Sequence, residues 1–513
     1  MPKFSIVIPA RNRADTLYYT LKTCLNQRDF DDYEIVVSDN CSEDNTEEMV
    51  KEFNSEKIKY YKTESFLDMV NHWNFAMSKA IGEYVFILGS DDAIHAHGLY
   101  FLDRIISITG EKVINCTTNL YNWPNNNTTL YENLFFLYAN HATSIINTKE
   151  GVKNVVETLW GRGLPHIYAM GVAHKSLVDK LIDKNNINAW PSNCDTYFGF
   201  KLASMIDYFV HIHMPFSCAG RSKNSGFTNT AVIEETPISI EFNHAEITSK
   251  FYDVGIRSMY NSLTNDFNQV KTKLNVFQDI DIDISKFIRN IIEERYHFAK
   301  HHGNEGKDFF QKELATIKDV IENTPEYKAN FHGENLNIDD YKFYELARCR
   351  IPEINNSILK FNASQFGIDN IYDATLFAEK LLYSKEYIDV YLTKFEENWN
   401  KHKNMFALLS KYDRIGIFGV FEHLGGLINA YKYFCRKDAI ALFDNDKTKH
   451  GTIFCGYKIL SPESIPDNKL DALVISSRKT QNEIYESVKK YAQNTEIIKF
   501  YDKIGDDVFF KCI

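Results

Sequence analysis

The first hundred residues alternate between short apolar runs and amphipathic stretches. The apolar run at residues 4–8 stops at Pro9, and residues 15–27 then place their leucines on one face of a helix. The same alternation predicts strands at residues 33–37, 58–62 and 84–88, with helices ending near Phe53 and covering residues 69–80. Strands alternating with helices of this length indicate a doubly wound, mostly parallel sheet.

Polar clusters follow three of the predicted strands. They are the loop from Pro9 through Ala10, Arg11 and Asn12 to Arg13, the pair Asp39-Asn40, and the triplet Ser90-Asp91-Asp92. Ligands of doubly wound sheets bind outside the carboxyl ends of the strands. We therefore expect the three clusters to meet in one crevice.

The residue types in these clusters favour a divalent metal over a glycine-rich phosphate loop. Residues 9–13 contain no glycine, whereas dinucleotide and P-loop sites need glycine there. Asp91 and Asp92 offer the oxygen ligands that Mg²⁺ or Mn²⁺ prefers, and such a metal would bridge a nucleotide diphosphate. Asp39 is placed to accept a hydrogen bond from a base or ribose. The alternatives are that the aspartate pair belongs to a solvated turn and that Asp39 caps the next helix.

Four segments together resemble one enzyme family. They read SIVIPARNR at residues 5–13, EIVVSDNCSEDNT at 34–46, NHWNFA at 71–76 and AIGEYVFILGSDD at 80–92. In this order and spacing they resemble the family 2 glycosyltransferases with the GT-A fold, over residues 3–100 and more loosely to about 230. The resemblance implies inverting transfer of a sugar from a nucleotide-diphosphate donor to a saccharide or lipid-linked saccharide, as in the synthesis of bacterial capsule or lipopolysaccharide.

The resemblance also implies site residues. Asp195, at the start of a helix within residues 190–203, matches the family's general base. It departs from the common pattern because Cys194 replaces a second acidic residue, and the alternative is that Asp195 only caps the helix. Asp92, with Asp91, is implied as the metal ligand, and His213 as an additional ligand or else a structural histidine. The implied donor-nucleotide contacts are Pro9, Ala10, Arg11, Asn12, Asp39, Asn74, Asp91, Arg221 and Ser222.

The changes in charge content and hydrophobic periodicity along the sequence predict three domains. They are a GT-A domain at 1–234, a helical linker or accessory region at 235–405 and a Rossmann-like α/β domain at 406–513. In the last domain Asp444 follows Gly419 at the distance of a ribose-binding carboxylate, but the G-x-G-x-x-G pattern is absent. Residues 442–451 and 456–462 resemble the Rossmann-like module at the end of sugar C-methyltransferases and some polysaccharide glycosyltransferases. Three alternatives stay open: a C-terminal domain that binds NAD or another nucleotide, a sugar nucleotidyltransferase, and a scaffold without activity.

Composition limits the partners and the compartment. The 513 residues carry a net charge of −11, which argues against a nucleic-acid partner. The nine cysteines form no Cys-x-x-Cys pair, as expected for reduced thiols in the cytoplasm. The first strand begins directly after the N-terminus, and no apolar run approaches the roughly 20 residues of a membrane span, so we expect membrane contact to be peripheral. Self-association into a homo-oligomer is compatible with the sequence.

Overall fold

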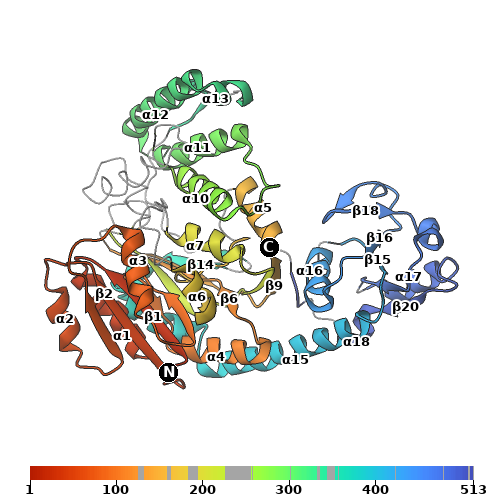
Figure 1. Cartoon of the computed structure of the whole chain (residues 1–513), viewed down its shortest axis with the longest axis horizontal. Coiled ribbons are helices and arrows are strands. Elements are labelled where there is room, and N and C mark those ends of the chain that lie inside the picture. The colour runs from red at the N-terminus through yellow and green to blue at the C-terminus, as the bar shows by residue number, and fades with distance from the viewer. Residues whose placement is uncertain are drawn as a thin grey trace.

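The computed structural model describes residues 1–124, 132–158, 163–182, 194–223, 225, 256, 258–300, 302–331, 336–343, 353–355, 358–421, 423–477, 479–505 and 509–511. These residues form three sheets with helices around them (Figure 1). The predicted mixed α/β architecture, with an N-terminal sheet, a helical middle and a C-terminal α/β unit, is confirmed.

The N-terminal sheet has eight strands in the order β3-β2-β1-β4-β10-β6-β11-β9. Its strands β1 to β4 are all parallel, as the alternating pattern predicts. The strands are β1 (Phe4–Ala10), β2 (Tyr33–Asp39), β3 (Ile58–Lys62), β4 (Tyr84–Ile87), β6 (Val113–Cys116), β9 (Thr143–Asn147), β10 (Gly171–His174) and β11 (Tyr208–Ile212). The helices of this part are α1 (Ala14–Leu25), α2 (Thr46–Glu52), α3 (Met69–Ser78), α4 (Gly98–Thr109), α5 (Thr148–Thr158), α6 (Lys175–Leu181) and α7 (Cys194–Ala203).

Strand β1 continues through Pro9, where the sequence predicted its end. The pairing of β1 with β4 stops at Val7, so beyond that point β1 is bonded only to β2. The missing N–H of Pro9 therefore removes no ladder hydrogen bond, because proline is tolerated where that side of a strand is unpaired. The longer strand places Ala10 directly beside Asp39 of β2.

A second sheet, in the order β13-β14-β8-β7-β12-β5, lies against the first. Its strands are β5 (Ala93–Ile94), β7 (Asn119–Asn122), β8 (Leu134–Tyr138), β12 (Ser217–Arg221), β13 (Glu353–Asn355) and β14 (Ile358–Asn362). Strand β5 begins directly after the Asp91-Asp92 pair and pairs with β12. The chain that follows the predicted metal motif is thus held against residues 217–221.

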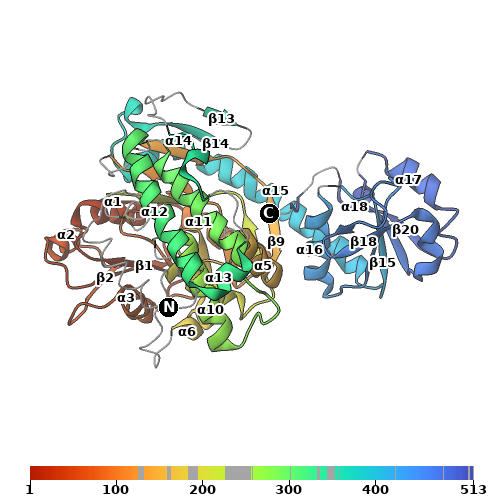
Figure 2. The same cartoon turned by 90° about the horizontal axis from the view of Figure 1, so that it is seen from above.

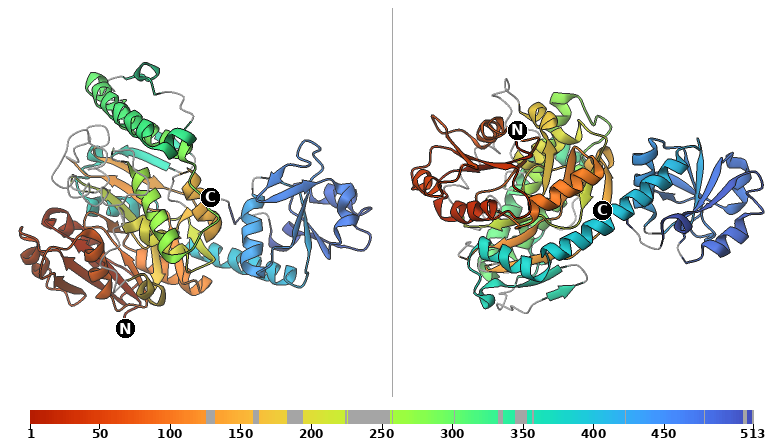
Figure 3. Two further views of the ribbon diagram at one scale, coloured as in Figure 1. Left: turned by 45° about the horizontal axis from the view of Figure 1, so that its top comes forward. Right: turned by 90° about the horizontal axis from the view of Figure 1, so that it is seen from below.

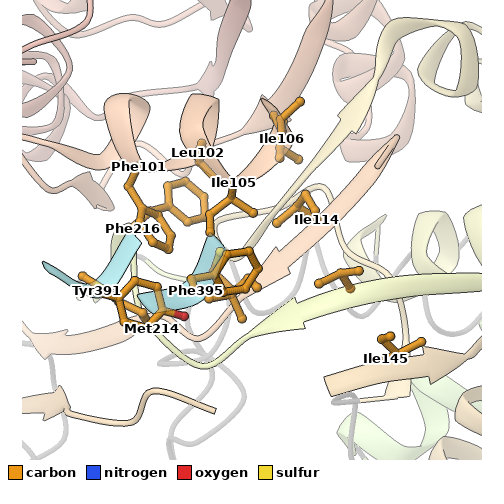
Figure 4. Packing of buried hydrophobic residues seen from close by; sticks show 14 of the residues in the cluster. Phe101, Leu102, Ile105, Ile106, Ile114, Ile145, Met214, Phe216, Tyr391 and Phe395 are labelled. Carbon is orange, nitrogen blue, oxygen red and sulfur yellow. The ribbon is translucent and has the colours of Figure 1, made fainter. Parts of the chain in front are cut away.

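The elements in the middle of the chain pack in two different places. Helices α10 (Met259–Leu274), α11 (Ile284–Ala299), α12 (Gly303–Asn323) and α13 (Pro325–Asn330) form a separate layer over α7 (Figure 1). Strands β13 and β14 instead extend the second sheet, and α14 (Ile371–Leu381) and α15 (Lys385–Leu409) pack on α1 and α4. In Figure 4 Tyr391 and Phe395 of α15 lie in the same apolar cluster as Phe101 and Ile105 of α4. The domain boundaries at 234 and 405 stay predictions.

Helix α15 runs from this N-terminal body to the C-terminal sheet (Figure 2). The C-terminal strands follow the order β17-β18-β16-β15-β19-β20, and all pairs except β17 with β18 are parallel. They are β15 (Ile415–Phe418), β16 (Ile440–Phe443), β17 (Ile453–Phe454), β18 (Tyr457–Leu460), β19 (Ala472–Ile475) and β20 (Glu496–Lys499), with helices α16 (Leu424–Cys435), α17 (Gln481–Val488) and α18 (Phe500–Ile504).

The end of the chain returns to the N-terminal sheet. Phe510 forms a parallel bridge with Thr143 at the start of β9, and Lys511 N donates to Thr143 O at 2.9 Å. The rings of Phe509 and Phe510 also pack against His402 of α15, which anchors the C-terminal unit on the edge strand of the first sheet. Figure 3 shows this unit at the far end of the long helix α15. Among the helices that the structure describes, none is long and apolar enough to cross a bilayer.

Candidate active site

Asp92 is almost completely buried where the chain leaves β4, and its carboxylate is held by the backbone. Its Oδ2 accepts a hydrogen bond from Gly89 N at 2.8 Å, and its Oδ1 accepts one from Gly220 N at 2.7 Å. Burial and the neighbouring Asp91 raise the pKa of Asp92 to about 7, and the two backbone amides act against that rise. The negative charge of a buried carboxylate beside a second carboxylate must be neutralised by a cation or a proton.

Asp91 connects the same turn to the strand β12 and to the first loop. Its Oδ2 accepts hydrogen bonds from the backbone N of Ser222 at 3.2 Å and from the Ser222 hydroxyl at 2.5 Å. The Arg13 guanidinium lies 3.3 Å from the same oxygen and donates to Ser90 Oγ at 3.2 Å. Arg13 is thus a site residue that the sequence analysis named only as part of the first loop.

The aspartate pair fits a divalent metal of the kind that shares its coordination with a substrate. Mg²⁺ and Mn²⁺ bind through one or two carboxylates and complete their shell with phosphate oxygens and water. Asp91 and Asp92 together carry two negative charges when ionised, and Arg13 balances one of them. No group of three His, Cys, Asp or Glu ligands occurs among the described residues, so the remaining ligands would come from the donor diphosphate and water.

Asp39 ends strand β2 and is fully buried. Its Oδ2 accepts a hydrogen bond from the Tyr60 hydroxyl at 2.5 Å, and its Oδ1 accepts one from Ser42 N at 2.8 Å. Tyr60 comes from β3, the neighbouring strand, so two elements fix the direction of this carboxylate. The alternative that Asp39 caps α2 is not supported by the contacts, because Asp39 bonds Ser42, which precedes that helix.

The first loop joins the Asp39 turn to the aspartate pair. Asn12 adopts a left-handed conformation (φ +52°), donates its backbone N–H to Ser42 Oγ at 2.9 Å and accepts a hydrogen bond from Glu43 N at 2.8 Å. One residue later Arg13 reaches Asp91. The three polar clusters therefore do meet at one end of the sheet, as the parallel strand pattern predicted.

Two further predicted nucleotide contacts lie around this end of the sheet. The Arg11 guanidinium carbon lies 4.2 Å from the centre of the Phe66 ring, in the loop after β3. The Oδ1 atom of Asn74, on α3, is buried and has no hydrogen-bond partner within the described part of the chain. A buried amide oxygen without a donor is costly unless a ligand or water supplies one.

Asp195 lies in the first turn of α7 and is partly buried. Its Oδ1 accepts a hydrogen bond from Thr196 N at 2.7 Å, and burial raises the pKa of the carboxyl while His166 and that amide oppose the rise. Helix α7 is hydrogen-bonded to the neighbouring helix α10, because Thr196 Oγ1 donates to the buried Asp266 of α10 at 2.5 Å. A carboxylate with a raised pKa is a better proton acceptor than a fully solvated one.

Arg221 and His213, two residues of the predicted site, lie in different places in the fold. Arg221 ends β12 one residue before Ser222, and its carbonyl accepts a hydrogen bond from Trp123 N at 3.1 Å. His213 follows β11, and its Nε2 lies 3.1 Å from Ser144 Oγ of β9 while its ring packs on His211 at 4.7 Å. The structure thus brings the end of β12 to the aspartate pair and places His213 beside the edge strand β9.

In the C-terminal unit, Asp444 directly follows β16, opposite the glycine turn after β15. Its Oδ2 accepts hydrogen bonds from Val420 N at 2.8 Å and from Lys449 Nζ at 3.2 Å. In a dinucleotide site the backbone N–H groups after this glycine would face the pyrophosphate. Here one of them is already taken by the protein's own carboxylate.

Comparison with known protein families gives two matches. Residues 5–162 match the family model described as glycosyl transferase family 2. Residues 411–498 match a model described as C2185-like, N-terminal. The first match covers all three polar clusters, and it ends before Asp195.

The curated relatives resemble part of the chain. The chain is 36% identical over 97 residues to GalNAc(5)-diNAcBac-PP-undecaprenol beta-1,3-glucosyltransferase of Campylobacter jejuni, covering 18% of this chain and 31% of that protein. It is 41% identical over 91 residues to chondroitin synthase of Escherichia coli, covering 17% and 13%. It is 36% identical over 104 residues to poly(ribitol-phosphate) beta-N-acetylglucosaminyltransferase TarP of Staphylococcus aureus, covering 19% and 31%. The chain thus spans about a third of the length of these relatives or less.

Solved structures resemble the chain more distantly. The fragment 1–349 of Staphylococcus aureus TarS in complex with UDP aligns with a TM-score of 0.34 and 16% identity, over 62% of this chain and 88% of that one. The mannosyltransferase PcManGT of Pyrobaculum calidifontis, in complex with GDP-Man and Mn²⁺, aligns with a TM-score of 0.31 and 14% identity, over 54% and 76%.

Proposed function

We propose, from the premise that residues 5–162 form a glycosyl transferase family 2 domain, that this protein transfers a sugar from a nucleotide-diphosphate donor to a saccharide or lipid-linked saccharide. The observation that carries the proposal is the buried pair Asp91 and Asp92, which is held by backbone amides and faces one arginine. Among the relatives, one is named as a glucosyltransferase for a lipid-linked saccharide and another as an N-acetylglucosaminyltransferase for poly(ribitol-phosphate), and both are bacterial, which supports a role in surface-polymer synthesis. The proposal places this role at the cytoplasmic face of the membrane.

In the proposed reaction each residue has one task. Asp39, oriented by Tyr60, accepts a hydrogen bond from the donor base or ribose. The first loop and residues 221–222 line the diphosphate. A divalent cation held by Asp91 and Asp92 would stabilise the negative charge of the departing diphosphate. Asp195 takes the proton of the acceptor hydroxyl while that oxygen attacks the anomeric carbon, so that one displacement inverts the configuration.

The rival functions make different demands on the same residues. A sugar nucleotidyltransferase would want a glycine-rich phosphate loop after β1, whereas residues 9–13 contain none. A C-terminal NAD or nucleotide site would need the amide of Val420, which Asp444 occupies. A scaffold without activity would not need an aspartate pair so deeply buried.

A thermal-shift experiment tests the proposal. The protein is heated with UDP, GDP, CDP, dTDP, NAD⁺ or S-adenosylmethionine, each with and without Mn²⁺. We expect one nucleoside diphosphate to raise the melting temperature only with Mn²⁺, because a ligand that binds the folded state stabilises it. Asp92→Asn should abolish that shift. Asp31→Asn is the matched control, because Asp31 is a solvent-exposed acid that forms a surface ion pair with Lys57.

Stabilisation by NAD⁺ or S-adenosylmethionine alone would contradict the proposal and move the chemistry to the C-terminal unit. A Mn²⁺-dependent shift that Asp92→Asn leaves intact would contradict the metal role of this aspartate.

A further inference from the structure

Tyr168 lies beside the end of β4, outside every motif of the sequence analysis. Ile87 N of β4 donates to Ile167 O at 2.6 Å, and Ala169 N donates back to Ile87 O at 2.8 Å. Five residues after Ile87 the same stretch of chain reaches Asp92. The end of β4 therefore fixes the backbone positions of both Tyr168 and the aspartate.

The Tyr168 hydroxyl lies beside the Asp92 carboxylate, where it is placed to donate a hydrogen bond to it. Both groups lie over Gly89, where a Cβ atom would come within 2.7 Å of the tyrosine oxygen and of Asp92 Oδ2. A tyrosine hydroxyl carries its proton at neutral pH, so next to a carboxylate it acts as the donor.

The ring of Tyr168 connects this hydroxyl to the helix that carries Asp195. Its centre lies 5.5 Å from that of Trp73 on α3, and the Trp73 ring stacks on Phe198 at 6.2 Å with an interplanar angle of 10°. Phe198 lies on α7, three residues after Asp195. One chain of contacts thus runs from the metal aspartate through three rings to the candidate base. Trp73 is packed between the rings of Tyr168 and Phe198, so its role here is packing.

We propose that Tyr168 is a positioning residue of the transfer site. Its hydroxyl directs the Asp92 carboxylate toward the metal and the donor, and its ring, through Trp73 and Phe198, holds α7 so that Asp195 keeps a constant distance from Asp92. This inference rests on the proposed function, because it assigns a task to Tyr168 within that same site. A tyrosine that merely fills space would need the ring alone.

Two variants separate the hydroxyl from the ring. Tyr168→Phe removes only the hydroxyl, and Tyr168→Ala removes the ring as well. The matched control is Tyr431→Phe, because Tyr431 is a buried tyrosine of the C-terminal unit whose hydroxyl has no hydrogen-bond partner within the described residues. Far-UV circular dichroism and thermal melting without ligand establish that each variant is folded, and the binding data are referred to the folded fraction.

The hydroxyl is tested by titrating Mn²⁺ in the presence of UDP and, in parallel series, of GDP, CDP and dTDP, with calorimetric detection. We expect Tyr168→Phe to raise the Mn²⁺ concentration needed for half-maximal nucleotide binding about tenfold, as loss of a hydrogen bond to a charged group does. In an Asp92→Asn background the Mn²⁺-dependent binding is already lost, so the substitution is compared there by urea denaturation. It should change the free energy of unfolding less than it does in the native background, because the bond's partner is already altered. Tyr431→Phe should behave like the native protein.

The ring is tested by amide hydrogen exchange of α7. Tyr168→Ala should speed exchange in residues 194–203, whereas Tyr168→Phe should not, because local opening follows lost packing. Any of three results would overturn the inference while leaving the proposed function intact. They are native-like Mn²⁺ dependence in Tyr168→Phe, equal effects of Tyr168→Phe with and without Asp92→Asn, and unchanged exchange in Tyr168→Ala. If the native protein binds none of the four nucleotides in a Mn²⁺-dependent way, the proposed function fails and the inference fails with it.

Discussion

The Tyr60 hydroxyl lies 2.5 Å from Asp39 Oδ2 and joins two neighbouring strands through their side chains at the proposed nucleotide end of the sheet. Burial and Asp39 hold the pKa of Tyr60 far above its ordinary value, so the tyrosine remains a donor. A carboxylate that must recognise a base profits from such a fixed direction, because a freely rotating side chain would lose rotamer entropy on binding.

The first prediction is that Tyr60→Phe weakens binding of the nucleoside diphosphate roughly tenfold, since it removes a hydrogen bond to a charged group. Tyr61→Phe is the control. Tyr61 is the next residue of β3, its side chain points to the opposite face, and its ring contacts Lys79. Isothermal titration with the nucleotide identified by thermal shift measures both. Equal affinity of Tyr60→Phe and the native protein would show that Asp39 does not depend on Tyr60.

The second prediction concerns Gly220, whose missing side chain allows β12 to approach the aspartate pair. A Cβ atom at this position would lie 1.8 Å from Asp91 O and 2.8 Å from Trp123 Nε1. Gly220→Ala should therefore push β12 away, break the bond from Gly220 N to Asp92, and cost about 1–3 kcal/mol of unfolding free energy, as overpacking does.

The readouts for Gly220→Ala are urea denaturation and Mn²⁺-dependent nucleotide binding. We expect Gly220→Ala to lower the free energy of unfolding and to weaken the Mn²⁺-dependent binding. The control Ala219→Gly, at the adjacent position of the same strand, should lower the free energy of unfolding slightly and leave the metal dependence unchanged. A Gly220→Ala protein with native nucleotide binding would mean that the N–H bond to Asp92 is dispensable.

The third prediction separates donor binding from transfer. Asp195→Asn removes the proton acceptor and leaves the aspartate pair and Asp39 untouched, so the donor should bind with native affinity while kcat falls by two orders of magnitude or more, a typical loss for a general base. Thr196→Val is the companion variant, because it removes the hydroxyl that donates to Asp266 and keeps the carboxylate. Full turnover of Asp195→Asn with bound donor would contradict the assignment of the base.

Much of the site was predictable because its chemistry is local in the sequence. The apolar run of β4 and the two aspartates that follow it identify a strand end with carboxylates, and parallel pairing brings Asp39 and the first loop to the same edge. Arg13 could have been singled out as well, because it follows the first strand in the same loop.

The remaining site residues depend on contacts between distant segments. Tyr60 and Tyr168 lie in stretches without a motif, and only the pairing of β2 with β3 and of Ile87 with Tyr168 brings them to their carboxylates. Pro9 was predicted to end β1 because proline usually stops a strand, whereas here β4 has already ended and no bond is lost. Residues 358–362 form strand β14 within the second sheet, although the charged, helix-period texture of that region predicted helices.

The last prediction follows from His402, which is buried where α15 meets the end of the chain. Its ring packs on Phe509 and Phe510, and burial lowers its pKa from 6.5 to about 4, while Asn398 O partly opposes the shift. Above pH 6.5 the histidine is neutral in the folded and the unfolded chain, so stability is unaffected by its titration. As the pH falls from 6.5 to about 4, the unfolded chain takes up a proton that the folded chain refuses, and stability is lost.

His402→Leu removes this titration and keeps the site apolar. Between about pH 7 and about pH 4.5 the unfolding free energy of the variant should therefore fall by roughly 2 kcal/mol less than that of the native protein. Urea denaturation at the two pH values measures the difference. The remaining acid sensitivity should persist, because His72 and His95 are also buried with lowered pKa values. An identical pH dependence of His402→Leu and the native protein would show that His402 is accessible to protons, and hence that the Phe509-Phe510 contact opens before the rest of the fold.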